Sequence, residues 1–302
     1  MKKTTILDIK AFEDKATLEE FYCNRFDRHL EKNHREISIP HKHNFYLVVL
    51  FTAGTGFHEI DFIRFDVQRG SVFFLSPGQT HHWEFSTPAN GFIFFHSDTF
   101  FELNFTQQRL SQFPFYYSSQ NVPMVLLSEH QTEKMEKEFS ALFHETTQIQ
   151  LYRKQKIVQL MDGIYIDLAR IYLSETQTKQ AVKSNYSQQI KMLENHINRH
   201  YKLQKSPSFY ADQMHVSTKH LNRIVNESIG KTTSTLISER ILLEAKRYLC
   251  NPSMNIVEIA TELGFEDSAY FSRFFRKNEG MRPTEFRSKY ITVSSKHAVE
   301  NE

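Results

Sequence analysis

Cysteine is scarce in this sequence: only two of the 302 residues are cysteines, and Cys23 and Cys250 lie far apart. Such spacing excludes a disulfide framework and a structural zinc site built on closely spaced cysteine pairs, and it suits a reducing compartment. No apolar run approaches the length of about eighteen residues that a transmembrane helix needs. The N-terminal Met1-Lys2-Lys3 lacks the apolar core of a signal peptide. We therefore expect a cytoplasmic protein without a membrane partner.

A large net charge is also missing, because the formal net charge is only +2. The charge is nevertheless unevenly distributed. Residues 188–302 carry 17 Lys and Arg against 13 Asp and Glu, whereas residues 1–187 carry 20 against 22. The modest basic excess of the C-terminal part is compatible with a nucleic-acid partner, although solvated surface charge alone could produce it.

One pattern occurs twice near the C-terminus, fifty residues apart. Leu221-Asn222-Arg223 is followed by Gly230, and Phe271-Ser272-Arg273 is followed by Gly280, so that each glycine comes nine residues after its apolar anchor. A short apolar-periodic segment precedes each copy, and the combination predicts a helix, a tight turn and a second helix. Two such units, over about 207–230 and 255–280, predict contacts with two successive major-groove segments of DNA.

The second copy has the clearer local signals. Asn255 is a candidate N-cap, Gly264 suits a turn with positive φ, and Asp267 is a candidate cap for the following helix. Phe265 is expected to fill the core between the two helices. The alternative is an ordinary helical bundle with a solvated charged face, which the duplication disfavours.

The outward positions of both second helices carry small polar residues and cations. Small side chains allow close approach to base edges, arginine can bond guanine bidentately, asparagine suits adenine, and lysine neutralises phosphate. The candidate DNA-binding residues are Thr218, Lys219, Asn222, Arg223, Lys231, Ser268, Ala269, Ser272, Arg273, Arg276 and Lys277.

Residues 188–291 resemble the AraC/XylS family of bacterial transcription regulators. The resemblance is carried by residues 259–277, from Ile259-Ala260 through Gly264-Phe265 to Arg276-Lys277, and continues through Gly280 and Arg282-Pro283. It implies that one helix of each unit enters the major groove and that a long helix, here Ser234–Cys250, separates the units. The first unit departs from the commoner family pattern at Val225 and Asn226, where an aromatic residue and a lysine are more usual.

The N-terminal half changes to a strand-like pattern. Short aromatic and β-branched segments alternate with turn residues, which predicts a small antiparallel barrel or jelly roll. The expected strands are Phe45–Phe51, Gly56–Phe62, Ser71–Leu75, His82–Phe85 and Gly91–Phe95, and the expected turns are Ala53-Gly54, Arg69-Gly70, Pro77-Gly78 and Asn90-Gly91. The fold class is therefore α+β in two domains, with an all-α C-terminal domain.

Two fragments make the barrel resemble a cupin, namely Pro40-His41-Lys42-His43 and Gly70 through His81. In metal-binding cupins, two histidines, a glutamate and a later histidine hold one ion, but Leu47 stands at the glutamate position here. We therefore expect no metal and no cofactor. Two alternatives stay open, namely that His41, His43 and His81 form a three-histidine metal site, or that these histidines only meet solvent at the barrel mouth. The candidate effector-binding residues are His41, His43, Tyr46, His81 and Trp83.

Two helices are expected after the barrel, one from Ser128 to about Thr147 and one over residues 151–173. The second has an apolar stripe, which either packs on the barrel or pairs with its twin. Because a helix at this place pairs with its twin in similar regulators, we expect a homodimer through residues 151–173. Residues 174–187 are polar and predict a linker. The expected domains are thus 1–173 for effector sensing and dimerisation and 188–302 for DNA binding.

Together these features predict a DNA-binding transcription regulator and not an enzyme. We expect an activator, although the sequence does not separate activation from repression. The expected partners are double-stranded promoter DNA, RNA polymerase and a small organic effector in the barrel. Two alternatives remain, a dimeric regulator without a ligand and a metal-dependent cupin enzyme with an accessory helical domain.

Overall fold

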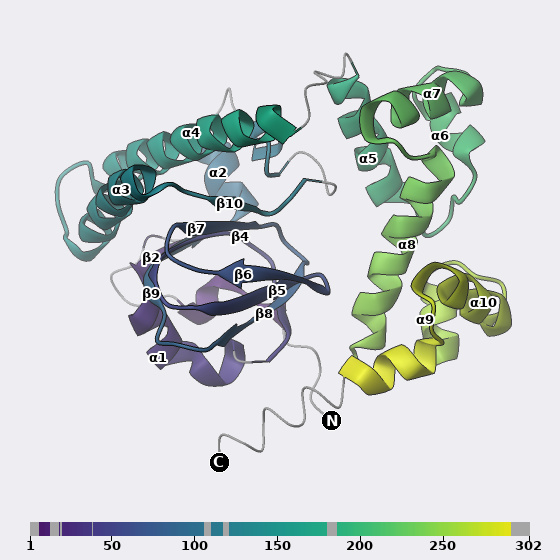
Figure 1. Ribbon diagram of the computed structural model, residues 1–302, viewed down its shortest axis with the longest axis horizontal. Helices are drawn as coiled ribbons and strands as arrows, with labels where there is room; N and C mark the ends of the chain where they lie inside the picture. Colours follow the sequence, from purple (N-terminus) through teal and green to yellow (C-terminus); the bar gives the residue numbers. More distant parts are fainter. Residues whose placement is uncertain are drawn as a thin grey trace. The chain divides into compact units, whose positions relative to one another are not determined.

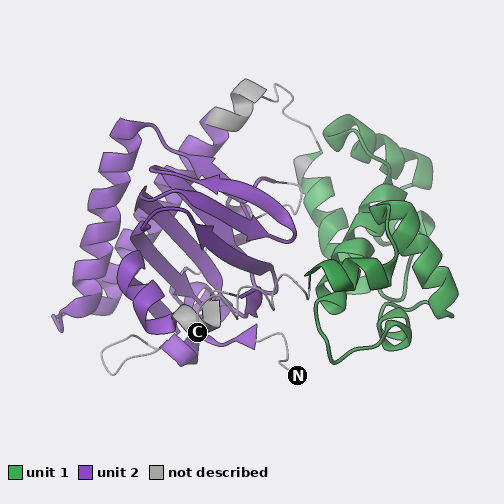
Figure 2. Cartoon of the chain, turned by 60° about the horizontal axis from the view of Figure 1, so that its bottom comes forward, with its two compact units in different colours: residues 1–4, 180–302 green, residues 5–179 purple. Residues whose placement is uncertain are grey.

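The computed structural model describes residues 6–12, 18, 20–37, 39–105, 110–116, 121–179 and 186–290. The chain forms two compact units (Figure 2). The sensor unit comprises residues 5–179, and the helical unit comprises residues 180–302 together with residues 1–4.

Two five-stranded sheets form the sensor unit, which confirms the β-rich, cupin-like fold (Figure 1). Neighbouring strands pair antiparallel, except for β1 and β3, which are parallel. In sheet order, the first sheet contains β1 (Ile6–Leu7), β3 (His41–His43), β8 (Thr80–Phe85), β5 (Gly56–Ile60) and β6 (Ile63–Val67), and the second contains β10 (Met124–Leu126), β7 (Ser71–Leu75), β4 (Tyr46–Ala53), β9 (Asn90–His96) and β2 (Phe21–Arg25).

The second sheet is buried on both faces, which explains its unbroken apolar runs. Side chains alternate along a strand, so Val48 and Leu50 belong to one core cluster while Leu47, Val49 and Phe51 belong to the other. The first cluster includes residues of α3 (Glu129–Thr147) and α4 (Arg153–Lys179), and these two helices cover that face of the sheet in Figure 1. The second cluster fills the space between the sheets.

Two strand predictions need correction. Asn90 was expected in a turn and Gly91 where that turn meets the strand Gly91–Phe95, but both lie in β9 beside β4. A Cβ on Gly91 would come within 1.9 Å of the Leu50 carbonyl oxygen, so glycine is required there by close strand contact. Asp61 and Phe62 were expected in the strand Gly56–Phe62, but they form a two-residue turn between β5 and β6 in which both φ angles are positive.

The other elements of the sensor unit flank the sheets. They are the short 3₁₀ segments Ile9–Phe12 and Leu110–Gln112, α1 (Phe26–Ile37) and α2 (Asp98–Asn104). The Ser128 side chain accepts a hydrogen bond from Gln131 N and thereby caps α3 where the sequence predicts its start. Helix α4 continues to Lys179 and so includes the first residues of the expected linker, whereas residues 180–185 lie outside the described residues.

Helices make up the second unit. In chain order they are α5 (Ser187–His200), α6 (Pro207–Gln213), α7 (Thr218–Ile229), α8 (Thr233–Leu249), α9 (Ile256–Glu262) and α10 (Ser268–Glu279), followed by helical residues 283–290. Helix α8 matches the expected separating helix, and its buried side chains include Leu236, Ile241 and Ala245. Helices α6 and α7 form the first helix-turn-helix unit, and α9 and α10 form the second.

Candidate DNA interface and barrel site

The two helix-turn-helix units are built by matching local interactions. Ser217 caps α7 by accepting from His220 N, and Asp267 caps α10 by accepting from Tyr270 N. Both helices end at a glycine in the left-handed region, where φ is 67° at Gly230 and 82° at Gly280. Capped ends give both helices the same length of twelve residues.

The turns inside the two units also match, although their sequences differ. Val216 N donates to Ala211 O in the first turn, and Phe265 N donates to Ala260 O in the second. Each bond closes a turn around one residue with positive φ. That residue is His215, with φ of 54°, in the first unit and Gly264, with φ of 67°, in the second.

Exposed side chains on α7 and α10 occupy corresponding positions. Thr218, Lys219 and Arg223 are exposed on α7, while Ala269 and Arg273 are exposed on α10. Each set lies opposite the side chains that pack into the unit, among which Leu221 and Phe271 are fully buried. The remaining exposed cations near the end of α10 are Arg276 and Lys277, and Ser268 and Ser272 are half-buried.

At least four of the predicted DNA-binding side chains already have hydrogen-bond partners, and one of these bonds lies within α10, where Ser272 Oγ donates to Ser268 O at 2.7 Å. The Asn222 Oδ1 atom accepts from Thr233 N at 3.0 Å, which ties α7 to the start of α8. Lys231 donates to both carboxylate oxygens of Glu239 at 2.7 and 2.9 Å. Arg223 Nη2 donates to His220 Nδ1 at 2.9 Å and stays exposed. Asn222 therefore has a structural role that its position in the sequence did not reveal.

Tyr270 was not among the predicted site residues. Its side chain is 53% exposed on α10, and the Arg273 guanidinium lies 5.9 Å from the centre of its ring. The spacing of three residues places both side chains on one helix face. The sequence signal that could have identified Tyr270 is its position as an aromatic residue one helical turn before Arg273.

Four histidines meet between the two sheets of the sensor unit. They are His41 and His43 on β3, His58 on β5 and His81 on β8, and each is at most 2% exposed. The His81 ring centre lies 4.3 Å from that of His41, 5.0 Å from that of His43 and 5.2 Å from that of His58. The Trp83 ring lies 4.8 Å from His81. We call these five residues the barrel cluster.

The predicted site thus differs from the observed cluster by two residues. His58 joins the cluster although the sequence analysis did not name it, and its strand register opposite Trp83 was the missing information. Tyr46 is not part of it, because this residue faces the helical layer, where its ring stacks on His96 and contacts Tyr116. Placing Tyr46 with His41 and Trp83 was therefore wrong.

Hydrogen bonds orient the histidine rings. His43 Nδ1 donates to Phe45 O at 2.7 Å and His41 Nδ1 donates to Ile39 O at 3.0 Å, because a carbonyl can only accept. His58 Nε2 and His81 Nδ1 share one hydrogen bond of 3.0 Å. Within the described part of the chain, His43 Nε2, His58 Nδ1, His81 Nε2 and Trp83 Nε1 are buried and have no hydrogen-bond partner.

Burial keeps these histidines neutral at pH 7. It lowers the pKa of His41 to about 4 and that of His43 to about 3. Repulsion from His82 on His41 and from His41 on His43 acts in the same direction, while the hydrogen bonds to Ile39 O and Phe45 O oppose it. Burial also lowers the pKa of His58 and of His81 well below the usual histidine value. Among the described residues, no group of three or more histidine, cysteine, aspartate or glutamate side chains is arranged to hold a metal ion.

The apolar stripe of α4 packs inside the sensor unit. Ile157, Ile164 and Leu168 are buried against the second sheet and α3. The stripe therefore packs on the barrel, which is one of the two alternatives that the sequence left open, and a homodimer through residues 151–173 stays a prediction. No described helix is long and apolar enough for a membrane crossing.

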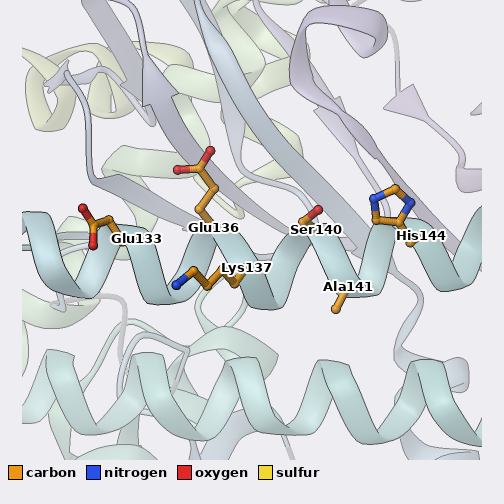
Figure 3. Close-up of a pocket in the computed structure, with 6 residues that line it drawn as sticks. All are labelled: Glu133, Glu136, Lys137, Ser140, Ala141 and His144. Atoms are coloured by element: carbon orange, nitrogen blue, oxygen red, sulfur yellow. The ribbon is translucent and has the colours of Figure 1, made fainter.

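The outer surface of α3 contains an open groove. Figure 3 shows its lining side chains projecting from α3, with acidic, basic and small residues close together. They are Glu133, Glu136, Lys137, Ser140, Ala141 and His144. A second groove lies between α2 and α4 and includes Phe105, Lys154 and Asp162.

Comparison with known families matches both units. A model described as an AraC-like ligand binding domain matches residues 26–146, and a model described as a helix-turn-helix domain matches residues 210–289. The HTH-type transcriptional activator RhaR of Mannheimia succiniciproducens is 21% identical over 274 residues, which cover 87% of this chain and 92% of that protein.

Further relatives span most of the chain. The HTH-type transcriptional regulator YfiF of Bacillus subtilis is 23% identical over 271 residues, which cover 84% of this chain and 80% of that protein. A crystal structure of unsaturated fatty acid bound ToxT from Vibrio cholerae aligns with a TM-score of 0.42 and 12% identity over 90% of this chain and 96% of that chain.

Proposed function

Because this chain belongs to the AraC family of DNA-binding transcription regulators, we propose that α7 and α10 bind two successive major-groove segments of one promoter. The observation that carries the proposal is the matched pair of exposed helix faces. Thr218 and Lys219 correspond to Ser268 and Ala269, and Arg223 corresponds to Arg273. In each unit, two residues occupy the same positions at the start of the helix, and an arginine follows one turn later.

Different residues carry different parts of the binding energy in this proposal. Arg223 and Arg273 contact bases, and Thr218, Ser268, Ala269 and Ser272 allow their helices to approach the groove closely. Lys219, Arg276 and Lys277 contact phosphates. Asn222 positions α7 through Thr233, and Lys231 contributes less charge because Glu239 pairs with it.

The sensor unit modulates this binding through a small organic effector. Support comes from the matched ligand-binding domain and from the barrel cluster, in which four buried nitrogens have no partner among the described residues. An effector with both donors and acceptors would gain hydrogen bonds that the protein leaves unmade. Its affinity must differ between the active and inactive arrangements of the chain for it to act as a switch.

A specific observation also favours a second candidate, in which the barrel has no ligand and only supports assembly. The interior between the sheets is filled by buried aromatic side chains, including Phe45, Phe51, Phe73 and Phe95. Thermal unfolding of the full chain with panels of sugars, aromatic acids and fatty acids separates the two. A compound that stabilises the chain and also changes its affinity for the promoter supports the effector proposal. A compound that stabilises the chain without changing that affinity does not regulate it.

We further propose that the chain acts in the cytoplasm as a homodimer that contacts RNA polymerase and has no catalytic role. Since the apolar stripe of α4 is used internally, the dimer contact is assigned to exposed residues of the same region. Leu151 is 84% exposed and Tyr152 69% exposed at the start of this region, and Leu173 is 42% exposed near its end. Sedimentation of the Leu151→Ser, Tyr152→Ser double variant tests this assignment, because an unchanged dimer would contradict it.

The direct test of DNA binding is selection of duplexes from a random pool by the full chain at physiological salt. The expected result is a motif with two conserved segments about one helical turn apart. The paired controls replace the arginines one at a time, and each should relax selection within one segment only. Recovery of random sequence by a folded protein, with and without candidate effectors, would contradict the proposal.

A further inference from the structure

The loop between α5 and α6, residues 201–206, reaches the turn of the second helix-turn-helix unit. Lys205 Nζ donates to Lys202 O at 2.9 Å within the loop and to Gly264 O at 2.6 Å in that turn. The same ammonium group lies 4.8 Å from the centre of the Phe265 ring. Lys205 thus contacts the peptide and the side chain that close the second unit.

A second pair of residues strengthens this connection. Lys202 forms an ion pair with Glu262, the last residue of α9. Tyr248 of α8 donates to the same carboxylate at 3.4 Å, and Lys202 lies 5.7 Å from the Tyr248 ring. The ion pair is partly exposed, as are the hydrogen bonds of Lys205, so its own contribution to stability is small.

The loop itself is held on the first unit. The buried Tyr210 of α6 donates its hydroxyl hydrogen to Gln204 O at 2.6 Å, and Ser206 caps α6. The Arg240 guanidinium of α8 lies 4.2 Å from the Tyr201 ring. A loop fixed at both ends can transmit the position of the first unit to the second.

Comparison of the two turns shows that the contact is specific to the second one. His215 and Gly264 have the same left-handed conformation, yet His215 is exposed and carries a large side chain. A Cβ on Gly264 would come within 1.9 Å of Lys202 O. Glycine is therefore needed at this position for contact with the loop as well as for its φ angle.

We propose that Lys205 is a positioning residue that fixes the orientation of α10 relative to α7 and thereby the spacing of the two DNA segments that one chain binds together. This inference rests on the proposed function for its consequence on DNA. Helix α8 alone would leave the two helix-turn-helix units free to rotate about its ends. The Arg287 side chain restrains one end by donating to Leu249 O and Met254 O, and Lys205 restrains the opposite side.

The first measurement does not require DNA. Glu227 and Glu266 are both exposed and can be replaced by cysteines in a Cys23→Ala, Cys250→Ser background. Spin labels on these two cysteines report the distance between the two helix-turn-helix units. Lys205→Met removes the ammonium group but keeps the aliphatic stem, and it should broaden the distance distribution. Lys205→Arg should restore a narrow distribution, and Lys289→Met, at an exposed lysine of residues 283–290, is the matched control.

The second measurement compares affinities for the selected duplex and for duplexes with one base pair added or removed between the segments. Wild type should prefer the selected spacing, and Lys205→Met should reduce this preference roughly three- to tenfold, the range for loss of one or two hydrogen bonds. Should Lys205→Met fail to fold, Glu262→Gln provides the same comparison through Lys202.

The outcomes separate the two proposals. An unchanged distance distribution in folded Lys205→Met overturns the positioning role, whatever happens on DNA. A broadened distribution with an unchanged spacing preference overturns its consequence for DNA. A broadened distribution in a chain that selects no duplex supports the mechanical role and contradicts the proposed function.

Discussion

His58 Nε2 lies 3.0 Å from His81 Nδ1, in a hydrogen bond that joins β5 to β8 inside the sensor unit. At least one of the two rings must be neutral, because one nitrogen must accept while the other donates. Their outer nitrogens, His58 Nδ1 and His81 Nε2, are both buried without a partner in the described residues. Protonating either ring would place a charge among His41 and His43 with no carboxylate in the cluster.

The sensor unit should therefore lose stability in mild acid. The pKa values of these histidines are lowered in the folded state by burial, to about 4 for His41 and about 3 for His43. Their stabilising contribution is present above the unfolded value of about 6.5 and is lost as the pH falls toward the folded values. Urea unfolding between pH 7 and pH 4 should show this decline.

Replacing His81 by glutamine should reduce the pH dependence of the free energy of unfolding by at most about 1.4 kcal/mol per pH unit, which is the limit for uptake of one proton. His130→Gln is the matched control, because His130 is exposed on α3. The same pH slope in wild type and His81→Gln would show that His81 does not take up a proton on unfolding in this range.

The two turns of the helical unit should respond oppositely to substitution. His215→Gly removes a side chain from a left-handed residue and should raise the free energy of unfolding by about 1 kcal/mol. Gly264→Ala adds both the left-handed penalty and a clash with Lys202 O, so it should lower that free energy by clearly more than 1 kcal/mol, on the order of 2 to 4 kcal/mol. Denaturant unfolding measures both, and equal effects of the same sign would contradict the account.

Arg273→Ala and Arg223→Ala should each weaken binding to the selected duplex by about 1 to 3 kcal/mol and leave the fold intact. Titrations against the selected duplex and a random duplex at two salt concentrations give the required comparison. An equal loss on both duplexes would assign the arginine to phosphate. Arg282→Ala, an exposed position outside the proposed interface, is the control.

Asn222→Ala should lower stability because it leaves Thr233 N without its acceptor. The expected loss is about 1 kcal/mol in the free energy of unfolding, with little change in base preference. Asn226→Ala, at an exposed position on the same helix, should have almost no effect on stability. A loss of adenine preference at unchanged stability would instead restore Asn222 as a base-reading residue.

Local sequence determined the helical unit. Asn255 forms a capping box with Glu258, and Gly264, Asp267 and Gly280 occupy the turn, cap and end that their types predict. Such signals act over a few residues, so they can be read without knowing the rest of the fold. The duplicated pattern then gives the arrangement of two units around α8.

Tertiary structure decided which side chains meet in the sensor unit. The strands containing Tyr46 and Phe95 have unbroken apolar runs, because both faces of their sheet are buried, and such runs do not reveal which face a side chain takes. Register between distant strands placed His58 with His81 and turned Tyr46 toward the helices. Likewise, the spacing of apolar residues in α4 predicted an apolar stripe on one helix face. Only the packing shows that the second sheet of the same chain covers Ile164 and Leu168.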